Sequence, residues 1–107
     1  MNPILVLTNA PDSEVAGRIA GHLIEQGLAA CVNILAPCTS IYHWQGRIES
    51  AQEIPLLIKT IRSRYMEVEA AICKLHPYEL PEIVQVPVEG GLPAYLQWMI
   101  SVTNRPT

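Results

Sequence analysis

Residues 76–82, His-Pro-Tyr-Glu-Leu-Pro-Glu, are the part of the sequence best suited to bind a ligand. Pro77 and Pro81 are expected to hold this backbone extended, so that its polar side chains are presented at low entropic cost. The His76 imidazole and the Glu82 carboxylate are ligand types that a borderline divalent ion accepts. Alternatively, His76 only ends the preceding helix, where the helix dipole favours a cationic imidazole.

Three consecutive rings, Tyr42, His43 and Trp44, precede an expected hairpin turn. Side chains alternate along a strand, so Tyr42 and Trp44 share one face and His43 points to the other. Amphipathic rings of this kind are enriched at subunit contacts, which is the interpretation we favour. They could instead wall a ligand cleft, and both interpretations hold if the cleft lies between subunits.

Charged residues cluster on the strand that returns from this hairpin. Glu49, Glu53 and Lys59 are separated by even numbers of residues, which places them on one side of an extended strand. On an exposed edge such charges are simply solvated. Because charged residues make up only 16% of the chain, the cluster also suggests a cleft for a polar or metal-linked ligand.

No pattern in the sequence predicts catalysis. A Cys/His nucleophile would need a thiol activated by His22, His43 or His76, yet the three cysteines fall on apolar strand or helix faces. These cysteines are Cys31, Cys38 and Cys73. No glycine-rich phosphate loop follows a strand, and no two Cys or His residues have the short spacing of a structural zinc site. We therefore expect no enzymatic activity and no required cofactor.

The 107 residues are 50% hydrophobic and carry a net charge of −3. One domain over residues 1–107 is the expected organisation, and its apolar residues outnumber the places that one small core offers. Subunit contacts would absorb this surplus. The charge gives no basic face for nucleic acid, the apolar runs are too short for a membrane span, and three unpaired cysteines suit a reducing compartment. We expect a cytoplasmic protein that binds neither nucleic acid nor membrane.

Hydrophobic periodicity predicts an α+β domain in the order β-α-β-β-α-β-α. Strands are expected at residues 4–7, 29–35, 41–44 with a return arm over 48–60, and 83–86, and helices at 12–27, 63–76 and 93–102. Gly46 marks the hairpin tip, and Pro55 indicates a bulge or an unpaired edge. This order describes a ferredoxin-like β-α-β-β-α-β sandwich with an extra C-terminal helix. That helix and partner subunits are the candidates to cover the sheet face opposite the crossover helices.

Five motifs in order resemble the CutA divalent-cation tolerance family across nearly the whole chain: AACVNI at 29–34, SIYHWQG at 40–46, EIPLLIKT at 53–60, HPYELPEI at 76–83 and YLQW at 95–98. The resemblance implies a tight homotrimer, similar in architecture to the PII-type signalling proteins, without a catalytic reaction. It also implies tolerance of copper and other divalent ions. The positions that match residues shared by the family in an intersubunit cleft are Tyr42, Trp44, Glu53, Lys59, Tyr78, Glu82 and Trp98.

For some bacterial members the resemblance implies copper ligands from a Cys at the end of the first strand and a His-His pair before the proline. Thr8 and Leu75 occupy two of these positions here, so only His76 remains. A single imidazole makes a weak copper site unless symmetry mates or Glu side chains complete it. We expect a non-enzymatic homotrimer that binds a small metabolite or, weakly, Cu²⁺ or Zn²⁺ at intersubunit clefts. The alternative is an assembly or signalling scaffold that binds protein partners.

Overall fold

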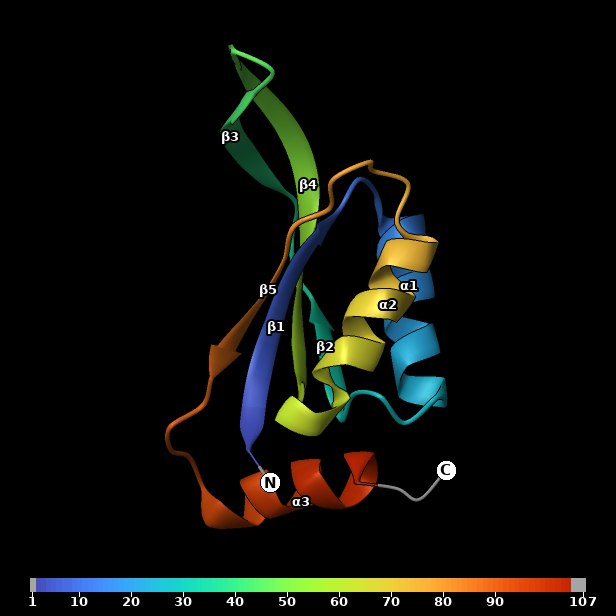
Figure 1. The fold of residues 1–107 in the computed structure, drawn as a ribbon, viewed down its shortest axis with the longest axis vertical. Coiled ribbons are helices and arrows are strands. Elements are labelled where there is room, and N and C mark those ends of the chain that lie inside the picture. Colours follow the sequence, from blue (N-terminus) through green and yellow to red (C-terminus); the bar gives the residue numbers. More distant parts are fainter. Residues whose placement is uncertain (1, 105–107) are drawn as a thin grey trace.

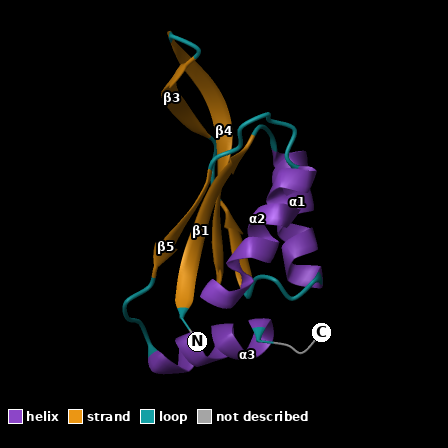
Figure 2. Ribbon diagram, viewed as in Figure 1, coloured by secondary structure: helices purple, strands orange, loops and turns teal. Residues whose placement is uncertain are grey.

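Figures 1 and 2 show a twisted sheet with two helices on one face and a third helix at one end. The computed structural model describes residues 2–104. The strands are β1 (Pro3–Ala10), β2 (Cys31–Ile34), β3 (Cys38–Trp44), β4 (Arg47–Ile61) and β5 (Ile83–Pro87). The helices are α1 (Ser13–Glu25), α2 (Tyr65–Leu75) and α3 (Pro93–Thr103), and a short 3₁₀ turn, η1 (Arg62–Arg64), precedes α2.

The sheet has the strand order β2-β4-β1-β5, and β3 also pairs with β4. All of these pairings are antiparallel. The crossover helices α1 and α2 lie on the same face (Figure 1), which confirms the predicted ferredoxin-like α+β fold. Among the described helices, none combines the length and hydropathy that crossing a bilayer requires.

Helix α1 begins and ends at the residues that the sequence indicates. The Asp12 carboxylate accepts a hydrogen bond from the Val15 amide at 2.8 Å, which satisfies one free N–H group of the first turn. Gly27 has a φ of +68°, and the Leu28 amide donates to the Leu23 carbonyl at 2.9 Å. This left-handed exit returns the chain to the sheet for β2.

The face of the sheet under α1 and α2 holds the hydrophobic core. Burial alternates along β1, where Ile4 and Val6 are buried and Leu5 and Leu7 are half-buried. Removing one such core side chain from water contributes about 1.5–3 kcal/mol. The core also includes Val15, Ile19, Leu23, Leu56, Ile58, Val68 and Ile72.

The separate strands expected at residues 29–35 and 41–44 are observed as β2 and β3, and both pair with β4. The predicted order counted the hairpin once, whereas its two arms form the two strands β3 and β4. Ile34 and Cys38 are four residues apart, whereas their partners on β4, Leu56 and Glu53, are three residues apart. The extra residue is accommodated opposite Pro55, which agrees with a bulge. The unpaired edge predicted at Pro55 is wrong, because β4 lies between β2 and β1.

Two other element boundaries differ from expectation. Strand β1 continues to Ala10 instead of ending after Leu7, because it stays paired with β4 to that point. Ser63 does not cap α2, since it lies within η1, and Arg64 precedes the helix without a side-chain cap. Each boundary was set by a long-range pairing or a local turn that periodicity does not encode.

The opposite face of the sheet is left largely open within residues 2–104. Val84 and Val86 of β5 pair with Leu7 and Leu5 of β1 on this face, and the two valines are 47% and 41% exposed. Helix α3 packs across one end of the sheet (Figure 1), where Met99 is buried. The C-terminal helix therefore covers one end of this face, and we call the remainder the open face.

Candidate functional site

The β3–β4 hairpin projects beyond the body of the molecule (Figure 1). Its strand β3 carries the aromatic residues Tyr42 and Trp44. Its turn at residues 45–46 has φ values of +50° and +78°, the left-handed pair of a type I′ turn that matches the twist of the strands. The register pairs Cys38 with Glu53 and Tyr42 with Glu49. Tyr42, Trp44 and Glu53 consequently share one face of the hairpin, as alternation predicts.

His76 ends α2 and anchors the chain that follows. Its Nδ1 accepts a hydrogen bond from the Tyr78 amide at 3.1 Å, so Nε2 carries the proton and donates to the Asn9 carbonyl at 2.6 Å. The residue is 6% exposed, and the Tyr78 ring packs against the imidazole with 4.6 Å between centroids. Because both ring nitrogens bind backbone groups, a metal ion could reach His76 only by displacing one of these bonds.

Asn9, at the end of β1, holds the segment 76–82 at two points. Its carbonyl accepts the bond from His76, and its side-chain amide donates to Glu82 Oε1 at 3.0 Å. Between these anchors the chain bends at residues 78–80, so the uniformly extended segment predicted from the two prolines is wrong. The bend occurs where the Tyr78 amide turns back to His76.

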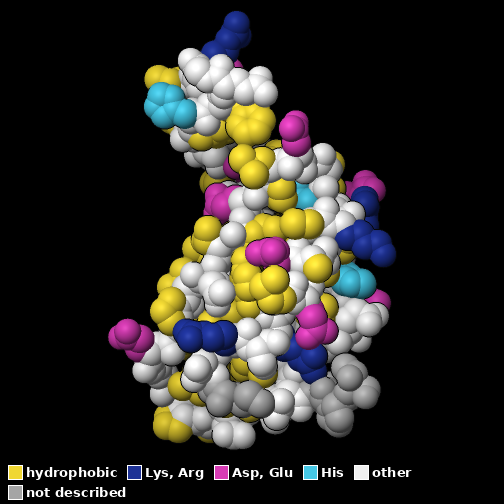
Figure 3. Space-filling view, viewed as in Figure 1, with side chains coloured by type: hydrophobic (Ala, Val, Ile, Leu, Met, Phe, Trp, Pro, Cys, Tyr) yellow, Lys and Arg dark blue, Asp and Glu magenta, His cyan; other side chains and the backbone are white. Residues whose placement is uncertain are grey.

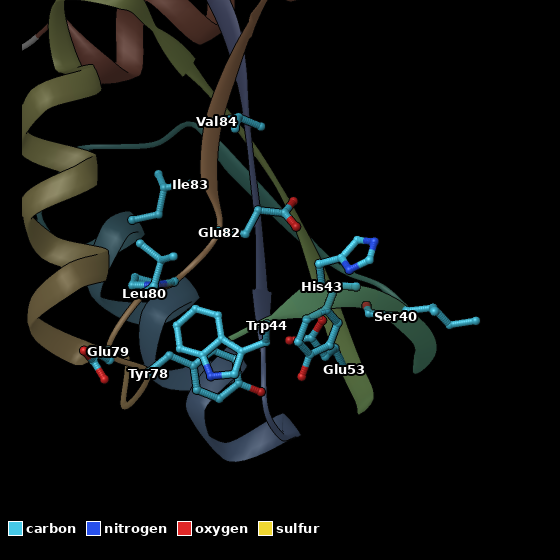
Figure 4. A pocket seen from close by; sticks show the side chains of 13 residues that line it. Ser40, His43, Trp44, Glu53, Tyr78, Glu79, Leu80, Glu82, Ile83 and Val84 are labelled. Atoms are coloured by element: carbon cyan, nitrogen blue, oxygen red, sulfur yellow. The ribbon is translucent and has the colours of Figure 1, made fainter. Parts of the chain in front are cut away.

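A cleft of about 920 Å³ lies between the hairpin and the segment after α2, and we call it the hairpin cleft. Figure 3 shows hydrophobic side chains gathered in the hollow between hairpin and body, and Figure 4 shows the lining. Its volume is within the range of small-molecule sites. The predicted site residues that line it are Tyr42, Trp44, Glu53, Tyr78 and Glu82.

The other lining residues were not among the positions matched to the family, although His43 is one of the rings considered as a cleft wall and residues 79–81 lie in the segment expected to bind a ligand. Each lies in one of the two segments, around residues 40–44 and 78–84, that contain predicted site residues, and this neighbourhood is the signal that could have identified them. Asn9 had no such signal, because its partners lie 67 and 73 residues away in the sequence. The additional lining residues are Ser40, Ile41, His43, Glu79, Leu80, Pro81, Ile83 and Val84.

Glu53 is the most buried charged residue of the hairpin cleft, with 8% of its surface exposed. The ion pairs described within residues 2–104 lie on α1 and at the start of α2, and neither includes a cleft carboxylate. Burial raises the pKa of Tyr78 above its usual value, and the nearby Glu53 carboxylate adds to the rise. The Tyr78 hydroxyl is therefore protonated at neutral pH.

The other two predicted residues, Lys59 and Trp98, lie apart from the hairpin cleft. Lys59 Nζ is 5.7 Å from the centre of the Tyr95 ring, which packs against Trp98 with 5.4 Å between centroids. We call Lys59, Tyr95 and Trp98 the Lys59 group. Six residue steps of extended strand separate Glu53 from Lys59, about 20 Å at roughly 3.3 Å per step. Within one chain, the predicted site residues therefore form two separate groups, one in the hairpin cleft and one around Lys59.

Within residues 2–104, no group of three or more His, Cys, Asp or Glu side chains could hold a metal ion. Thr8, at the position of an implied copper ligand, is 1% exposed and faces the helix-covered core. Its hydroxyl is buried without a hydrogen-bond partner. Copper or zinc binding at His76 stays a prediction.

The comparisons with known proteins agree on one family. The family model described as CutA1 divalent ion tolerance protein matches residues 4–102. The divalent-cation tolerance protein CutA of Thermus thermophilus is 45% identical over 95 residues, which cover 89% of this chain and 92% of that protein.

Solved structures give the same result. The crystal structure of CutA from Xylella fastidiosa aligns with a TM-score of 0.93 and 42% identity, covering 96% of this chain and 99% of that one. A protein from Archaeoglobus fulgidus, described as periplasmic divalent cation tolerance protein CutA, aligns with a TM-score of 0.91 and 38% identity, covering 94% and 98%. Motifs, fold and comparisons together show that this chain belongs to the CutA divalent ion tolerance family.

Proposed function

We propose that this chain acts as a non-enzymatic homotrimer that binds a small ligand or a divalent ion in clefts between its subunits. The division of the predicted site supports this most strongly. Glu53 and Glu82 line the hairpin cleft, whereas Lys59 lies about 20 Å from Glu53 along the same strand. Side chains so far apart cannot hold one small ligand in one chain. They can do so when a second chain brings its Lys59 group to the cleft.

The open face supports assembly. Its half-buried leucines and exposed valines form apolar surface that water contacts in a single chain, and such surface commonly marks a subunit contact. Strand β1 pairs with β4 only over residues 54–61, so β4 residues 47–53 have no β1 partner on that side. This free backbone edge is a second feature that another chain can cover.

The lining of the hairpin cleft favours binding over catalysis. It contains aromatic rings, carboxylates and Ser40, but no cysteine. The Ser40 hydroxyl lies 3.9 Å from the Cys38 thiol rather than against a histidine that could act as its base. We therefore assign the cleft a binding role.

A divalent ion is the alternative ligand, and we expect it to bind weakly. Thr8 and Leu75 replace two ligand positions, and His76 is bonded to backbone through both ring nitrogens. A cytoplasmic location is part of the proposal, supported by three free cysteines. The description of the Archaeoglobus relative as periplasmic makes fractionation of cells the direct test of location.

Mixed assemblies test whether the cleft lies between subunits. Glu53→Gln and Lys59→Gln each alter one wall of every proposed cleft, so calorimetric titrations with Cu²⁺, Zn²⁺ and a metabolite panel should show weaker binding for each variant. Trimers refolded from both variants together contain some clefts with both wild-type residues, and these should regain binding. Failure to regain it, in assemblies of unchanged mass, would contradict a cleft shared between subunits. Glu25→Gln, on α1, is the matched control.

The scaffold alternative is favoured by one observation. Ile41, at the edge of the hairpin cleft, and Ile48 alternate with Tyr42 and Trp44 along the hairpin, and each is 73% exposed. An exposed apolar pair of this kind suits a protein partner. If no ion or metabolite binds, and a partner is retained by wild type but lost by Ile41→Ser with Ile48→Ser, the scaffold function replaces the proposed one.

A further inference from the structure

The two groups of residues assigned to the shared cleft carry charges of opposite sign. Glu53 and Glu82 line the hairpin cleft, whereas Lys59 lies with Tyr95 in the other group. We propose that the ligand is a small zwitterion with an apolar body, whose ammonium group binds the carboxylates and whose anionic group binds Lys59 of the neighbouring chain. This inference rests on the proposed function, because a second chain must bring that lysine to the cleft. It adds the chemical class of the ligand.

Glu53 is the carboxylate best placed to bind the ammonium group. It is 8% exposed, and the ion pairs described within residues 2–104 do not include it. The Tyr78 hydroxyl donates a hydrogen bond to this carboxylate, but the donor is neutral and leaves the negative charge in place. Because a carboxylate has about four acceptor sites, Glu53 can bind an ammonium group while it keeps the bond from Tyr78.

The other polar side chains of the hairpin cleft leave this wall negative. Glu82 accepts a hydrogen bond from the Asn9 amide at 3.0 Å, again from a neutral donor. Glu79 adds a third carboxylate (Figure 4). His43 also lines the cleft, and a neutral imidazole can both donate and accept a hydrogen bond, so it favours neither sign of ligand charge. No lysine or arginine of the same chain lines this wall.

Lys59 supplies the opposite charge. It pairs across the sheet with Leu5 of β1, on the open face, and it is half-buried. Its Nζ is 5.7 Å from the centre of the Tyr95 ring, and the ion pairs described within residues 2–104 do not include it. The ring attracts the ammonium without neutralising it. Lys59 can therefore still donate charge-assisted hydrogen bonds to an anionic group of the ligand.

Aromatic rings in both groups suit an apolar body between the two charges. Trp44, on β3, and Tyr78, in the segment after α2, come from the two sides of the hairpin cleft (Figure 4). Five rings in the two groups keep between 38% and 43% of their surface exposed, so each has free area to contact a ligand. These rings are Tyr42, Trp44, Tyr78, Tyr95 and Trp98.

Ligands with a single kind of charge fit the shared cleft less well. An anion would meet the carboxylates of Glu53 and Glu82, and an organic cation would meet the ammonium of Lys59. A bare divalent ion needs several oxygen, nitrogen or sulfur ligands, and no suitable group of three exists within residues 2–104. The Lys59 group would add a positive charge and two rings, none of which binds a metal cation well.

Three probes that share one carbon skeleton separate the two charges. At neutral pH L-phenylalanine carries both charges, phenethylammonium only the positive one and 3-phenylpropionate only the negative one. In calorimetric titrations of the assembled wild type, L-phenylalanine should bind roughly tenfold more tightly than either single-charge probe, because each of those leaves one charged wall unpaired.

Variants assign each charge to its wall. Glu53→Gln should remove the advantage of L-phenylalanine over 3-phenylpropionate, and Lys59→Gln should remove its advantage over phenethylammonium. Glu25→Gln and Lys74→Gln remove exposed charges of the same two kinds from α1 and α2, and both should leave the order of the probes unchanged.

Four results would overturn the inference. A single-charge probe that binds as tightly as L-phenylalanine would assign the cleft to an anion or a cation. An advantage of L-phenylalanine that survives both Glu53→Gln and Lys59→Gln would place its binding elsewhere. Binding of none of the three probes would also contradict a zwitterion site. In that case, a loss of assembly mass in both variants would show that the two charges pair with each other. The proposed function fails separately, through the wild-type mass and the titrations of mixed assemblies.

Discussion

The two faces of the sheet are formed by the same strands but are completed differently. On the face under α1 and α2, Val6 and Ile58 have no exposed surface. On the open face, Val84 and Val86 keep 47% and 41% of theirs exposed. The chain supplies its own cover for the first face, whereas residues 2–104 leave the second largely uncovered. The candidate site follows the same division, because the hairpin cleft and the Lys59 group do not meet within one chain.

The largest effect that we expect is a difference in stability between substitutions of two neighbouring residues, one on each face of the sheet. Ile58→Ala leaves a cavity in the covered core and should lower the free energy of unfolding by about 2–5 kcal/mol. Leu57 is half-buried on the open face, so Leu57→Ala should matter mainly to the assembled protein. Urea unfolding at several protein concentrations measures both.

The dependence on concentration distinguishes the faces. The loss caused by Ile58→Ala should be the same at every concentration, whereas the effect of Leu57→Ala should grow as concentration favours assembly. If both losses were equal and independent of concentration, the open face would have no role in assembly.

A smaller effect is expected from two threonines of the covered face. Thr8 is buried without a hydrogen-bond partner, so Thr8→Val should stabilise the protein by about 1 kcal/mol. Thr60 is equally buried, but its hydroxyl donates to the Leu28 carbonyl at 2.6 Å. Thr60→Val should therefore destabilise it by about 1 kcal/mol or more. Thermal unfolding that gives both variants the same sign would contradict this account of the core.

A further effect is confined to alkaline pH. Burial raises the pKa of Tyr65 to about 12, and the bond from its hydroxyl to Glu69 at 2.8 Å adds to the rise. The unfolded chain loses this proton near pH 10.0 while the folded chain keeps it, so the free energy of unfolding should fall as pH rises from 10 to about 12. Tyr65→Phe lacks this contribution and should lose less stability over that interval. Urea unfolding of the wild type and of Tyr65→Phe, below and above pH 10, compares their losses of stability. Equal losses in the two proteins would contradict a raised pKa for Tyr65.

Local chemistry was predictable from sequence where one segment determines it. Asp12 and Gly27 set the ends of α1, and Gly46 marks the hairpin tip, because each depends on the conformation of a few adjacent residues. The alternation of Tyr42 and Trp44 is equally local. These signals were sufficient for the fold class, and five of the thirteen residues that line the hairpin cleft were among the predicted site residues.

Features that depend on distant residues were not predictable. The even spacing of Glu53 and Lys59 places both side chains on one side of β4. It could not show that, within one chain, Glu53 lies in the hairpin cleft and Lys59 lies beside Tyr95, apart from that cleft. The extra residue opposite Pro55 arises from two registers that do not match. Asn9 reaches His76 and Glu82 only after β1, α2 and β5 have come together.

The mass of the protein in solution tests the central claim that the open face is a subunit contact. One chain is 11.8 kDa, so light scattering should give about 35 kDa for the wild type, the mass of three chains. Val86→Asp places a charge on the open face and should reduce the mass towards that of one chain while circular dichroism stays that of the folded protein. A wild type that remains at 11.8 kDa at every concentration, or a Val86→Asp variant that stays trimeric, would contradict the account.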